Sequence, residues 1–189
     1  MRVIRGKFKN KKLYFPNNLI TRPLKDSVKE NIFNILEHSQ TKNFKIKNCK
    51  IMDLYAGSGS FGIECLSRDA SEVIFVEKDR EAIKNLKKNV EQLNLDEKYK
   101  IIERDIYDFI KNTKFKIKFD IIFLDPPYKN EDFANIIQLL KEKKFVNKNH
   151  IILIHREKNK QNNLDKYLKI IDSRIYGRSQ IFLGEFFQS

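Results

Sequence analysis

The chain has 189 residues, a length typical of one compact domain, and its two cysteines, Cys49 and Cys65, do not form a C-x-x-C pair. A disulfide scaffold and a cysteine-based zinc site are therefore excluded, and no apolar run approaches the ~20 residues that a membrane helix needs. The 38 Lys and Arg exceed the 25 Asp and Glu, and the resulting net charge of +13 is typical of proteins with a polyanionic partner such as nucleic acid.

The first 40 residues are predicted to form an extension made of a hairpin and a helix. The runs 2–5 and 12–15 are strand-like and are separated by turn residues, which predicts a β-hairpin. Asp26 is a suitable N-cap for a helix that continues to Leu36, because the apolar residues of this stretch recur near a spacing of 3.6.

From residue 50 onward, strand-like and helical patterns alternate. The strand-like runs are 50–55, 73–76, 100–102, 121–124 and 151–154. The helical patterns between them are 61–67, 79–93, 107–111 and 132–142. Near-continuous apolar strands joined by helices predict a parallel sheet covered on both faces. The last two strand-like runs, 168–172 and 180–186, have no helix between them, which favours an antiparallel pair at the end of the sheet.

These patterns predict a Rossmann-like α/β fold with a mostly parallel seven-stranded sheet, helices on both faces and an antiparallel terminal strand. We expect one domain over 1–189, in which 1–40 is the N-terminal extension and 41–189 is the core. Ligands in such folds bind at the carboxyl ends of the strands, so the candidate site lies in the loops that follow them. Because no apolar leader is visible at the N-terminus, we expect a cytoplasmic protein.

The first core strand runs into a glycine-rich turn that opens a helix. Its glycines Gly57, Gly59 and Gly62 satisfy G-x-G-x-x-G, a pattern that NAD sites also contain. Asp53 lies inside the strand, and a buried carboxylate at this point needs a cationic or donor-rich ligand. An amino acid moiety with an ammonium group meets that need, whereas a pyrophosphate does not.

Two more carboxylates follow the next two strands. Glu77 is placed to accept hydrogen bonds from both hydroxyls of a ribose, a contact found in dinucleotide and S-adenosylmethionine sites alike. Asp105 follows the third strand, where it could accept a hydrogen bond from an adenine amino group. Purely structural roles are the alternative, with Asp53 as a strand-end cap and Glu77 as a charge before a helix N-terminus.

The fourth core strand ends in the turn Asp125-Pro126-Pro127-Tyr128. Its prolines fix φ and lack N–H donors, so the turn offers mainly acceptors. Such a turn suits the exocyclic amine of a nucleobase, and the Tyr128 ring offers a face on which the base can stack. Acceptors at the Asp125 carboxylate and the Pro126 carbonyl would free the nitrogen lone pair for attack on a methyl group. An ordinary Pro-Pro turn with a capping Asp is the structural alternative.

Lysines and aromatic residues alternate near the N-terminus, a composition that suits an RNA strand. The lysines are Lys7, Lys9, Lys11 and Lys12, and the aromatic residues are Phe8, Tyr14 and Phe15. A solvated lysine-rich hairpin is the alternative, because an A/T-rich genome raises the share of Lys, Asn, Ile and Phe without selection for binding.

Together these phrases resemble a known family. The glycines and carboxylates of the first three strands are similar to the cofactor site of class I S-adenosylmethionine-dependent methyltransferases. The Asp-Pro-Pro-Tyr turn resembles the motif of enzymes that methylate the amine of adenine or guanine. Three further phrases, 1–13, 21–23 and 174–179, extend the resemblance to the bacterial methyltransferases that modify guanine N2 in 16S ribosomal RNA.

The resemblance implies S-adenosylmethionine as the cofactor and ribosomal RNA or the small ribosomal subunit as the partner. The cofactor-binding residues that it implies are Asp53, Tyr55, Ala56, Gly57, Ser58, Gly59, Glu77, Lys78, Asp105, Ile106 and Asp125. The implied catalytic residues are Asp125, Pro126, Pro127 and Tyr128. The expected substrate contacts are Arg22, Lys7, Lys9, Lys11, Lys12 and Tyr128. We expect a monomer without a metal site and without a membrane partner.

Several positions depart from the family pattern, and three other functions are compatible with parts of the sequence. The family often has Gly-Gly at 5–6, Thr-Thr at 24–25 and Arg at 27, and its fifth core strand commonly ends in a Glu-containing phrase where this chain reads Ile154-His155-Arg156-Glu157. An adenine-N6 methyltransferase of RNA or DNA would use the same Asp-Pro-Pro-Tyr turn. A non-catalytic RNA-binding or ribosome-assembly protein needs no intact cofactor site, and an NAD-dependent oxidoreductase leaves the Asp-Pro-Pro-Tyr turn unexplained.

Overall fold

The structure is a computed structural model, and it describes residues 1–16, 24–38, 44–95, 97–114, 116–127, 133–158 and 164–187. Within these ranges, none of the helices is both long enough and apolar enough to span a membrane.

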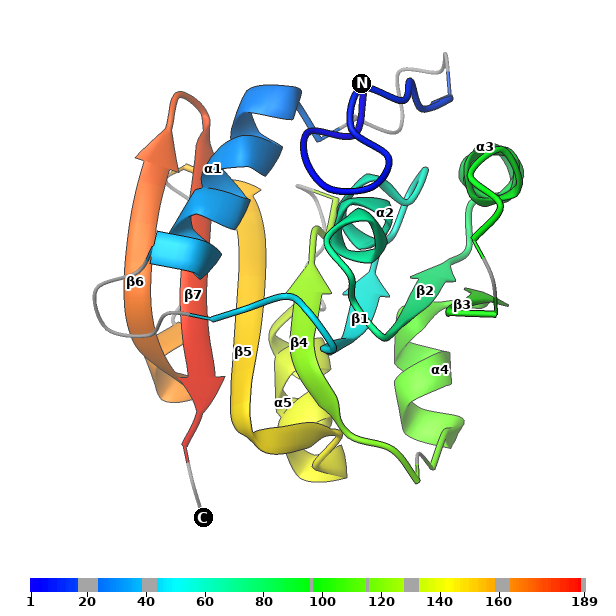
Figure 1. The fold of residues 1–189 in the computed structure, drawn as a ribbon. Coiled ribbons are helices and arrows are strands. Elements are labelled where there is room, and N and C mark those ends of the chain that lie inside the picture. The colour runs from blue at the N-terminus through cyan, green and yellow to red at the C-terminus, as the bar shows by residue number, and fades with distance from the viewer. Residues whose placement is uncertain are drawn as a thin grey trace.

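A seven-stranded sheet in the order β3-β2-β1-β4-β5-β7-β6 runs through the molecule (Figure 1). The strands are β1 (Lys50–Leu54), β2 (Glu72–Glu77), β3 (Tyr99–Glu103), β4 (Phe119–Leu124), β5 (Val146–Glu157), β6 (Leu168–Tyr176) and β7 (Ser179–Phe186). Strands β1 to β5 are parallel, whereas β7 is antiparallel to both β5 and β6. The predicted mostly parallel sheet with an antiparallel terminal strand is confirmed. The strand order reverses at β1 and β4, which is where folds of this class bind ligands.

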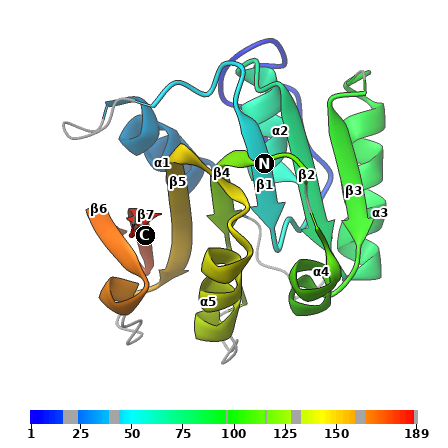
Figure 2. The same ribbon diagram turned by 90° about the horizontal axis from the view of Figure 1, so that it is seen from below.

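Helices cover both faces of the sheet, as predicted (Figure 2). They are α1 (Asp26–His38), α2 (Ser60–Ser67), α3 (Arg80–Glu91), α4 (Ile106–Asn112) and α5 (Phe133–Lys143), and a short 3-10 helix, η1 (Leu164–Lys166), precedes β6. Helices α1, α2 and α3 share one apolar core with the sheet, and α4 and α5 share the other. The two cores are separate because successive side chains of the buried strands alternate between the faces.

Aromatic side chains join α1 to the face of the sheet that α2 covers. The ring centroids of Phe33 and Phe61 are 5.3 Å apart, and those of Phe61 and Phe123 are 4.1 Å apart. This row runs from α1 through α2 to β4, so α2 links the N-terminal extension to the strand that precedes the Asp-Pro-Pro turn. The extension is therefore part of the core rather than an appendage.

The predicted N-terminal hairpin is reduced to a loop that one antiparallel bridge, Arg2 to Lys12, closes. The physical reason is competition for backbone donors. The N–H groups of Ile4 and Arg5 donate to the carboxylate of Glu64 at 2.7 and 2.9 Å, and that of Lys7 donates to the Ser67 carbonyl at 2.8 Å. Three backbone hydrogen bonds, donated by Val3, Asn10 and Leu13, still join the two runs, and bonds to α2 replace the rest of the ladder that two strands would form.

Candidate functional site

The carboxyl ends of β1, β2, β3 and β4 lie along one edge of the sheet because these strands are parallel. The four predicted carboxylates, Asp53, Glu77, Asp105 and Asp125, lie in or directly after those strand ends. Three of them are near neighbours, because the negative charges of Asp125 and Glu77 act on Asp53. The structure therefore brings together at one edge the acidic residues that the sequence places far apart.

The glycine loop joins the end of β1 to the start of α2, and its glycines have different roles. Gly57 has φ +56°, and a Cβ added to it would meet no atom within 4 Å. Gly59 has φ +82°, but its added Cβ would lie 2.3 Å from Leu86 Cδ1, and that of Gly62 would lie 2.2 Å from the Phe75 ring. Gly59 and Gly62 therefore allow close packing inside the protein, whereas Gly57 leaves the backbone open to a ligand.

Asp53 lies in β1 and is buried, and its side chain points toward the first turn of α2. Its Oδ2 atom accepts a hydrogen bond from the Gly62 N–H at 2.9 Å. Burial raises the pKa of this carboxyl well above its usual value, the Gly62 N–H lowers it, and the charges of Asp125 and Glu77 raise it further. A cationic ligand group at this edge would relieve that cost and favour the ionised carboxylate.

Glu77 ties the glycine loop to the end of β2. Its Oε2 atom accepts from the Gly57 N–H at 2.8 Å, and its Oε1 atom accepts from the N–H groups of Lys78 and Asp79 at 2.8 and 2.9 Å. An ionised carboxylate can accept about four hydrogen bonds, so these three bonds orient the group and leave capacity for a ligand hydroxyl. This side chain is thus fixed beside the open backbone of Gly57.

Asp105 caps helix α4, because its Oδ1 atom accepts from the Tyr107 N–H at 2.9 Å. Its Oδ2 atom accepts from Lys78 Nζ at 2.9 Å. Burial raises the pKa of Asp105, but the bond to Lys78 and the Lys78 charge outweigh this effect and hold the pKa below its usual value. The same contact raises the pKa of Lys78. Ile106, the first residue of α4, is buried in the core beside α5.

The Asp-Pro-Pro turn follows β4 directly and lies next to the end of β1. The Asp125 N–H points to the Leu54 carbonyl at 3.4 Å. Pro126 is buried and Pro127 is exposed. The predicted contacts Tyr128 and Arg22 lie outside the described residues. Asp125 Oδ1 contacts His155 Nδ1 of β5 at 2.8 Å, a partner that the sequence analysis did not identify. The only sequence signal for it was the departure from the family pattern at the end of this strand.

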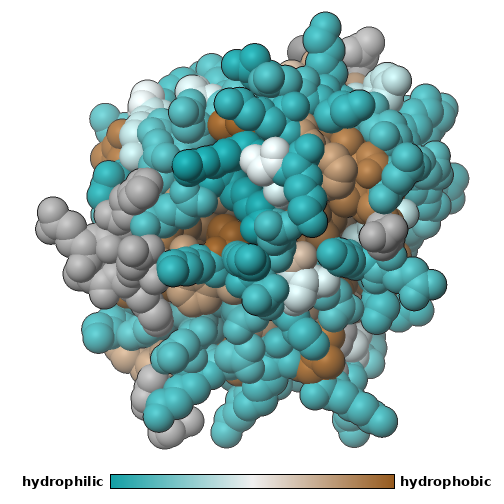
Figure 3. All heavy atoms as spheres, viewed as in Figure 1, coloured by the Kyte–Doolittle hydropathy of each residue, from teal (hydrophilic) through white to brown (hydrophobic). Residues whose placement is uncertain are grey.

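The N-terminal lysines are exposed, and they do not all lie near the glycine loop. Lys7 forms an ion pair with Asp69 at 2.8 Å, just after the last residue of α2. The eight residues of α2 span about 12 Å, so Lys7 stands one helix length from the loop. The surface of this side of the molecule is mostly hydrophilic, with small separate apolar areas (Figure 3).

The segment after these lysines is held beside the glycine loop by the buried side chain of Asn89 in α3. Its Oδ1 atom accepts from the Tyr14 N–H at 2.7 Å, and its Nδ2 atom donates to the carbonyls of Tyr14 and Ser58 at 2.8 and 2.9 Å. The Lys12 carbonyl accepts from Gln92 Nε2 at 3.0 Å. The rings of Tyr14 and Phe15 are exposed. One amide thus joins an exposed aromatic segment to the candidate cofactor loop.

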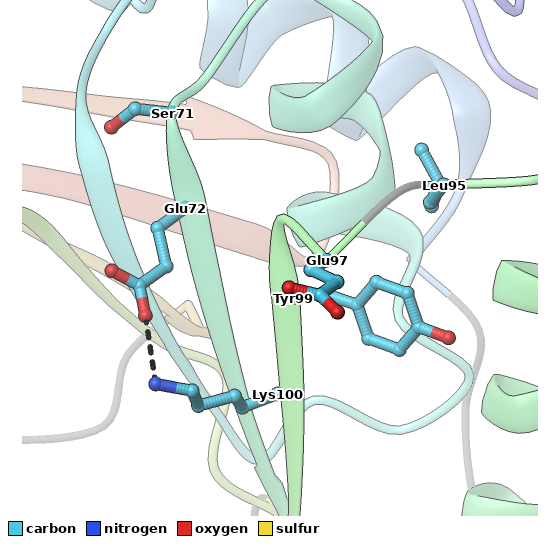
Figure 4. A pocket seen from close by; sticks show the side chains of 6 residues that line it. All are labelled: Ser71, Glu72, Leu95, Glu97, Tyr99 and Lys100. Atoms are coloured by element: carbon cyan, nitrogen blue, oxygen red, sulfur yellow. Dashed lines mark ion pairs between the residues drawn. The ribbon is translucent and has the colours of Figure 1, made fainter.

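A separate hollow lies at the opposite edge of the sheet, at the amino ends of β2 and β3 (Figure 4). It is lined by Ser71, Glu72, Leu95, Glu97, Tyr99 and Lys100. Glu72 and Lys100 form an ion pair across it at 3.4 Å. Because ligands in this fold class bind at the carboxyl ends, the hollow is not the candidate site. Over the described ranges, His, Cys, Asp and Glu side chains nowhere gather in a group that could hold a metal ion.

Comparison with known proteins agrees with the geometry. Residues 1–185 match the family described as Conserved hypothetical protein 95. Ribosomal RNA small subunit methyltransferase D of Buchnera aphidicola (Acyrthosiphon pisum strain APS) is 33% identical over 181 residues, which are 96% of this chain and 91% of that protein. The Haemophilus influenzae protein of the same name is 36% identical over 161 residues, which are 85% of this chain and 80% of that protein. The solved structure of yhhF from Escherichia coli, a protein assigned as a methyltransferase, is 26% identical with a TM-score of 0.83, and the match covers 98% of this chain and 97% of that one.

Proposed function

The chain belongs to the family of the bacterial ribosomal RNA small subunit methyltransferases D, and on that premise we propose that it transfers a methyl group from S-adenosylmethionine to the N2 amine of a guanine in 16S ribosomal RNA. The substrate is the RNA of the small ribosomal subunit. The residues proposed to act are those that the structure places at the carboxyl edge of the sheet, together with Arg22 and Tyr128, whose roles stay predictions.

The acidic edge supports S-adenosylmethionine rather than a dinucleotide. When bound, this cofactor supplies an electrophilic methyl group on a positively charged sulfur, and it carries an ammonium group as well. Asp53 is a buried carboxylate that a nearby cation would stabilise. The Glu77 carboxylate is held beside the open backbone of Gly57, where the hydroxyl groups of a ribose can donate hydrogen bonds to it. A pyrophosphate would instead meet several like charges along the same edge.

The observation that carries the proposed chemistry is the position of Asp125 and Pro126 directly beside that edge. The Asp125 carboxylate and the Pro126 carbonyl offer acceptors, and neither proline has an N–H group. A base amine whose N–H groups are accepted there keeps its lone pair free to attack the methyl group, and the N–H proton that becomes acidic on transfer can leave through one of these acceptors. Positioning of this kind supplies much of the rate in a transfer that needs no strong base.

The experiment uses small-subunit RNA, naked and in assembled subunits, from cells that lack this protein. The purified protein and S-adenosylmethionine are added, and nucleosides are identified by mass spectrometry. We expect N2-methylguanosine. N6-methyladenosine would instead support the adenine enzyme, and the absence of any methylated product with both substrates would support a non-catalytic RNA-binding protein.

Replacement of Asp125 separates chemistry from cofactor binding. We expect Asp125→Ala to lower the methylation rate by roughly two powers of ten or more, on the scale of a lost transition-state contact. Affinity for S-adenosylhomocysteine, measured by calorimetry, should change within a few-fold because Glu77 and Gly57 are untouched. An unchanged turnover would show that the Asp-Pro-Pro turn has only a structural role. Tight binding of NAD without binding of S-adenosylhomocysteine would overturn the cofactor assignment.

A further inference from the structure

We propose that His155 is a positioning residue for the methyl transfer, and that it acts by holding the Asp125 carboxylate in the orientation that accepts the substrate amine. This inference rests on the proposed function. Its basis is a contact of 2.8 Å between His155 Nδ1 and Asp125 Oδ1, both located at the carboxyl edge of the sheet.

Strand pairing places these two residues side by side. Strands β4 and β5 are parallel, and Leu124 is in register with Ile154. Asp125 directly follows β4, and His155 follows Ile154 within β5, so the two side chains leave the sheet on the same face and meet there. That face is the one on which Asp53 lies, because Asp53 is in register with Phe123, two residues before Asp125. The imidazole thus stands next to the carboxylate and on its cofactor side.

The direction of the hydrogen bond follows from the chemistry of the pair. An ionised carboxylate can only accept, so Nδ1 must carry the proton that it donates to Oδ1. The imidazole is 7% exposed, and its Nε2 atom is fully buried with no hydrogen-bond partner among the residues that the structure describes. If the ring were charged, Nε2 would carry an N–H group that is buried without an acceptor. Burying the unprotonated Nε2 of a neutral ring costs less free energy than burying that charged group. The geometry therefore favours the neutral tautomer with the proton on Nδ1.

The consequence for Asp125 is that one carboxylate oxygen accepts the bond from His155 and the other is available to accept a bond from the substrate amine. In the described part of the chain, Asp125 Oδ2 receives no hydrogen bond, whereas Oδ1 is fixed by His155. The bond also directs the positive end of the N–H dipole at the Asp125 carboxylate, which lies near the buried carboxyl of Asp53. Without His155, the carboxylate would lose the donor that sets its rotation, and the amine would meet an acceptor that is not held in place.

Two substitutions at this position test the donor. His155→Leu removes it and keeps an apolar side chain in the buried space, and His155→Asn keeps an N–H group at the position of Nδ1. We expect His155→Leu to lower kcat by about tenfold or more, with the KM for S-adenosylmethionine within a few-fold of the unchanged protein. His155→Asn should restore most of the rate. Thermal unfolding of both variants checks that the leucine variant is folded.

A double-mutant cycle then shows whether His155 acts through Asp125. In the Asp125→Ala background, His155→Leu should cause little further loss, because the group that it positions is gone. A loss in the double variant equal to the product of the two single losses would overturn the proposal. An unchanged kcat in His155→Leu would overturn it as well.

A spectroscopic measurement is independent of catalysis. In 15N spectra, His155 should show a protonated Nδ1 and an unprotonated Nε2, and Asp125→Ala should shift the Nδ1 signal. A protonated Nε2 with an unprotonated Nδ1 would contradict the assigned bond. If the unchanged protein methylates no RNA while the spectra are as expected, the proposed function fails and the contact remains. If the protein methylates guanine and neither substitution matters, the present inference alone fails.

Discussion

Asp53 shows at the scale of one residue how a proposed binding site can oppose stability. The carboxylate is buried, and its only neutral donor in the described structure is the Gly62 N–H. Burial raises its pKa, so the folded protein binds a proton that the unfolded chain releases. Ionisation of this group therefore destabilises the unbound protein, and a bound cation would offset the free-energy cost of the buried charge.

Asp53→Asn is expected to stabilise the unbound protein and to weaken cofactor binding. Because the folded-state pKa lies above the unfolded value, the penalty grows as pH rises from the unfolded value through the folded one, at about 1.4 kcal/mol for each pKa unit. Unfolding by denaturant should show a gain for the variant at pH 8 that shrinks toward pH 4, and calorimetry should show at least about tenfold weaker binding of S-adenosylhomocysteine.

Asp69→Asn is the matched control, because Lys7 lowers the pKa of that exposed carboxyl. It should give no gain in stability at pH 8 and no change in cofactor affinity. A less stable Asp53→Asn protein at pH 8, or one with unchanged affinity, would contradict the assignment of Asp53 to a cation.

Single residues of the site differ in how well the sequence predicts them. The positions of Asp53, Gly57 and Glu77 could be predicted, because each lies at or just after the end of a strand that the sequence pattern reveals. The carboxyl ends of parallel strands share one edge of the sheet. The contact of His155 could not be predicted, because it depends on the pairing of β4 with β5, which no local pattern contains. The separate roles of the glycines also need tertiary structure, since only the packing against Leu86 and Phe75 distinguishes them.

At the scale of elements, a buried ionic cluster clamps the N-terminal segment to α1 and α2. Glu64 and Lys29 are both fully buried, with Lys29 Nζ 3.7 Å from the carboxylate. Glu64 also accepts from Arg68 Nε at 3.0 Å and from the N–H groups of Ile4 and Arg5. Lys29 Nζ donates to the Arg2 carbonyl at 2.6 Å. Burial lowers the pKa of Lys29, although the charge of Glu64 opposes this effect.

Glu64→Gln is expected to destabilise the protein by about 3 to 5 kcal/mol, because it leaves the buried ammonium of Lys29 without its counter-charge. Hydrogen exchange at the amides of Ile4 and Arg5 should accelerate, since the acceptor of both is weakened. Glu72→Gln is the control, because that residue pairs with the exposed Lys100 at the opposite edge of the sheet and should change stability within about 1 kcal/mol. A Glu64→Gln protein as stable as this control would show that the cluster does not hold the segment.

The elements of the core could be predicted because their hydrophobic patterns are local and strong. The structure of the N-terminal loop could not be predicted in the same way, because it depends on Glu64 in α2. The carboxylate of Glu64 accepts hydrogen bonds from the backbone N–H groups of Ile4 and Arg5. Strand β5 is longer than predicted, beginning at Val146 and ending at Glu157. Its polar first half lacks an apolar signal, and its end is set by pairing with β7, in which Glu157 meets Ser179.

For the molecule as a whole, the question is whether the net charge of +13 reflects RNA binding or composition. The lysines of the N-terminal segment lie on the side of the sheet that α2 covers, and Asn89 holds Tyr14, which follows them, beside the glycine loop. Another group of exposed lysines, Lys114, Lys116, Lys118 and Lys144, precedes β4 and β5 at the amino edge of the sheet. The two groups of four lysines carry equal charge but lie at different positions. Replacing each group in turn can therefore distinguish RNA binding by the N-terminal segment from an effect of overall composition.

Replacing Lys7, Lys9, Lys11 and Lys12 by Gln is expected to weaken RNA binding and to flatten its salt dependence. Each lysine that contacts a phosphate releases counterions, so the slope of log affinity against log salt should fall by about 0.7 to 0.9 per contact removed. The control replaces the four lysines of the amino edge by Gln and removes the same charge, yet it should leave the slope nearly unchanged. Filter binding over a salt series measures both slopes, and calorimetry should show unchanged binding of S-adenosylhomocysteine in both variants. Equal slopes in the two variants would mean that the charge acts only as a general field, and the N-terminal segment would then lose its assigned place on the RNA-binding surface.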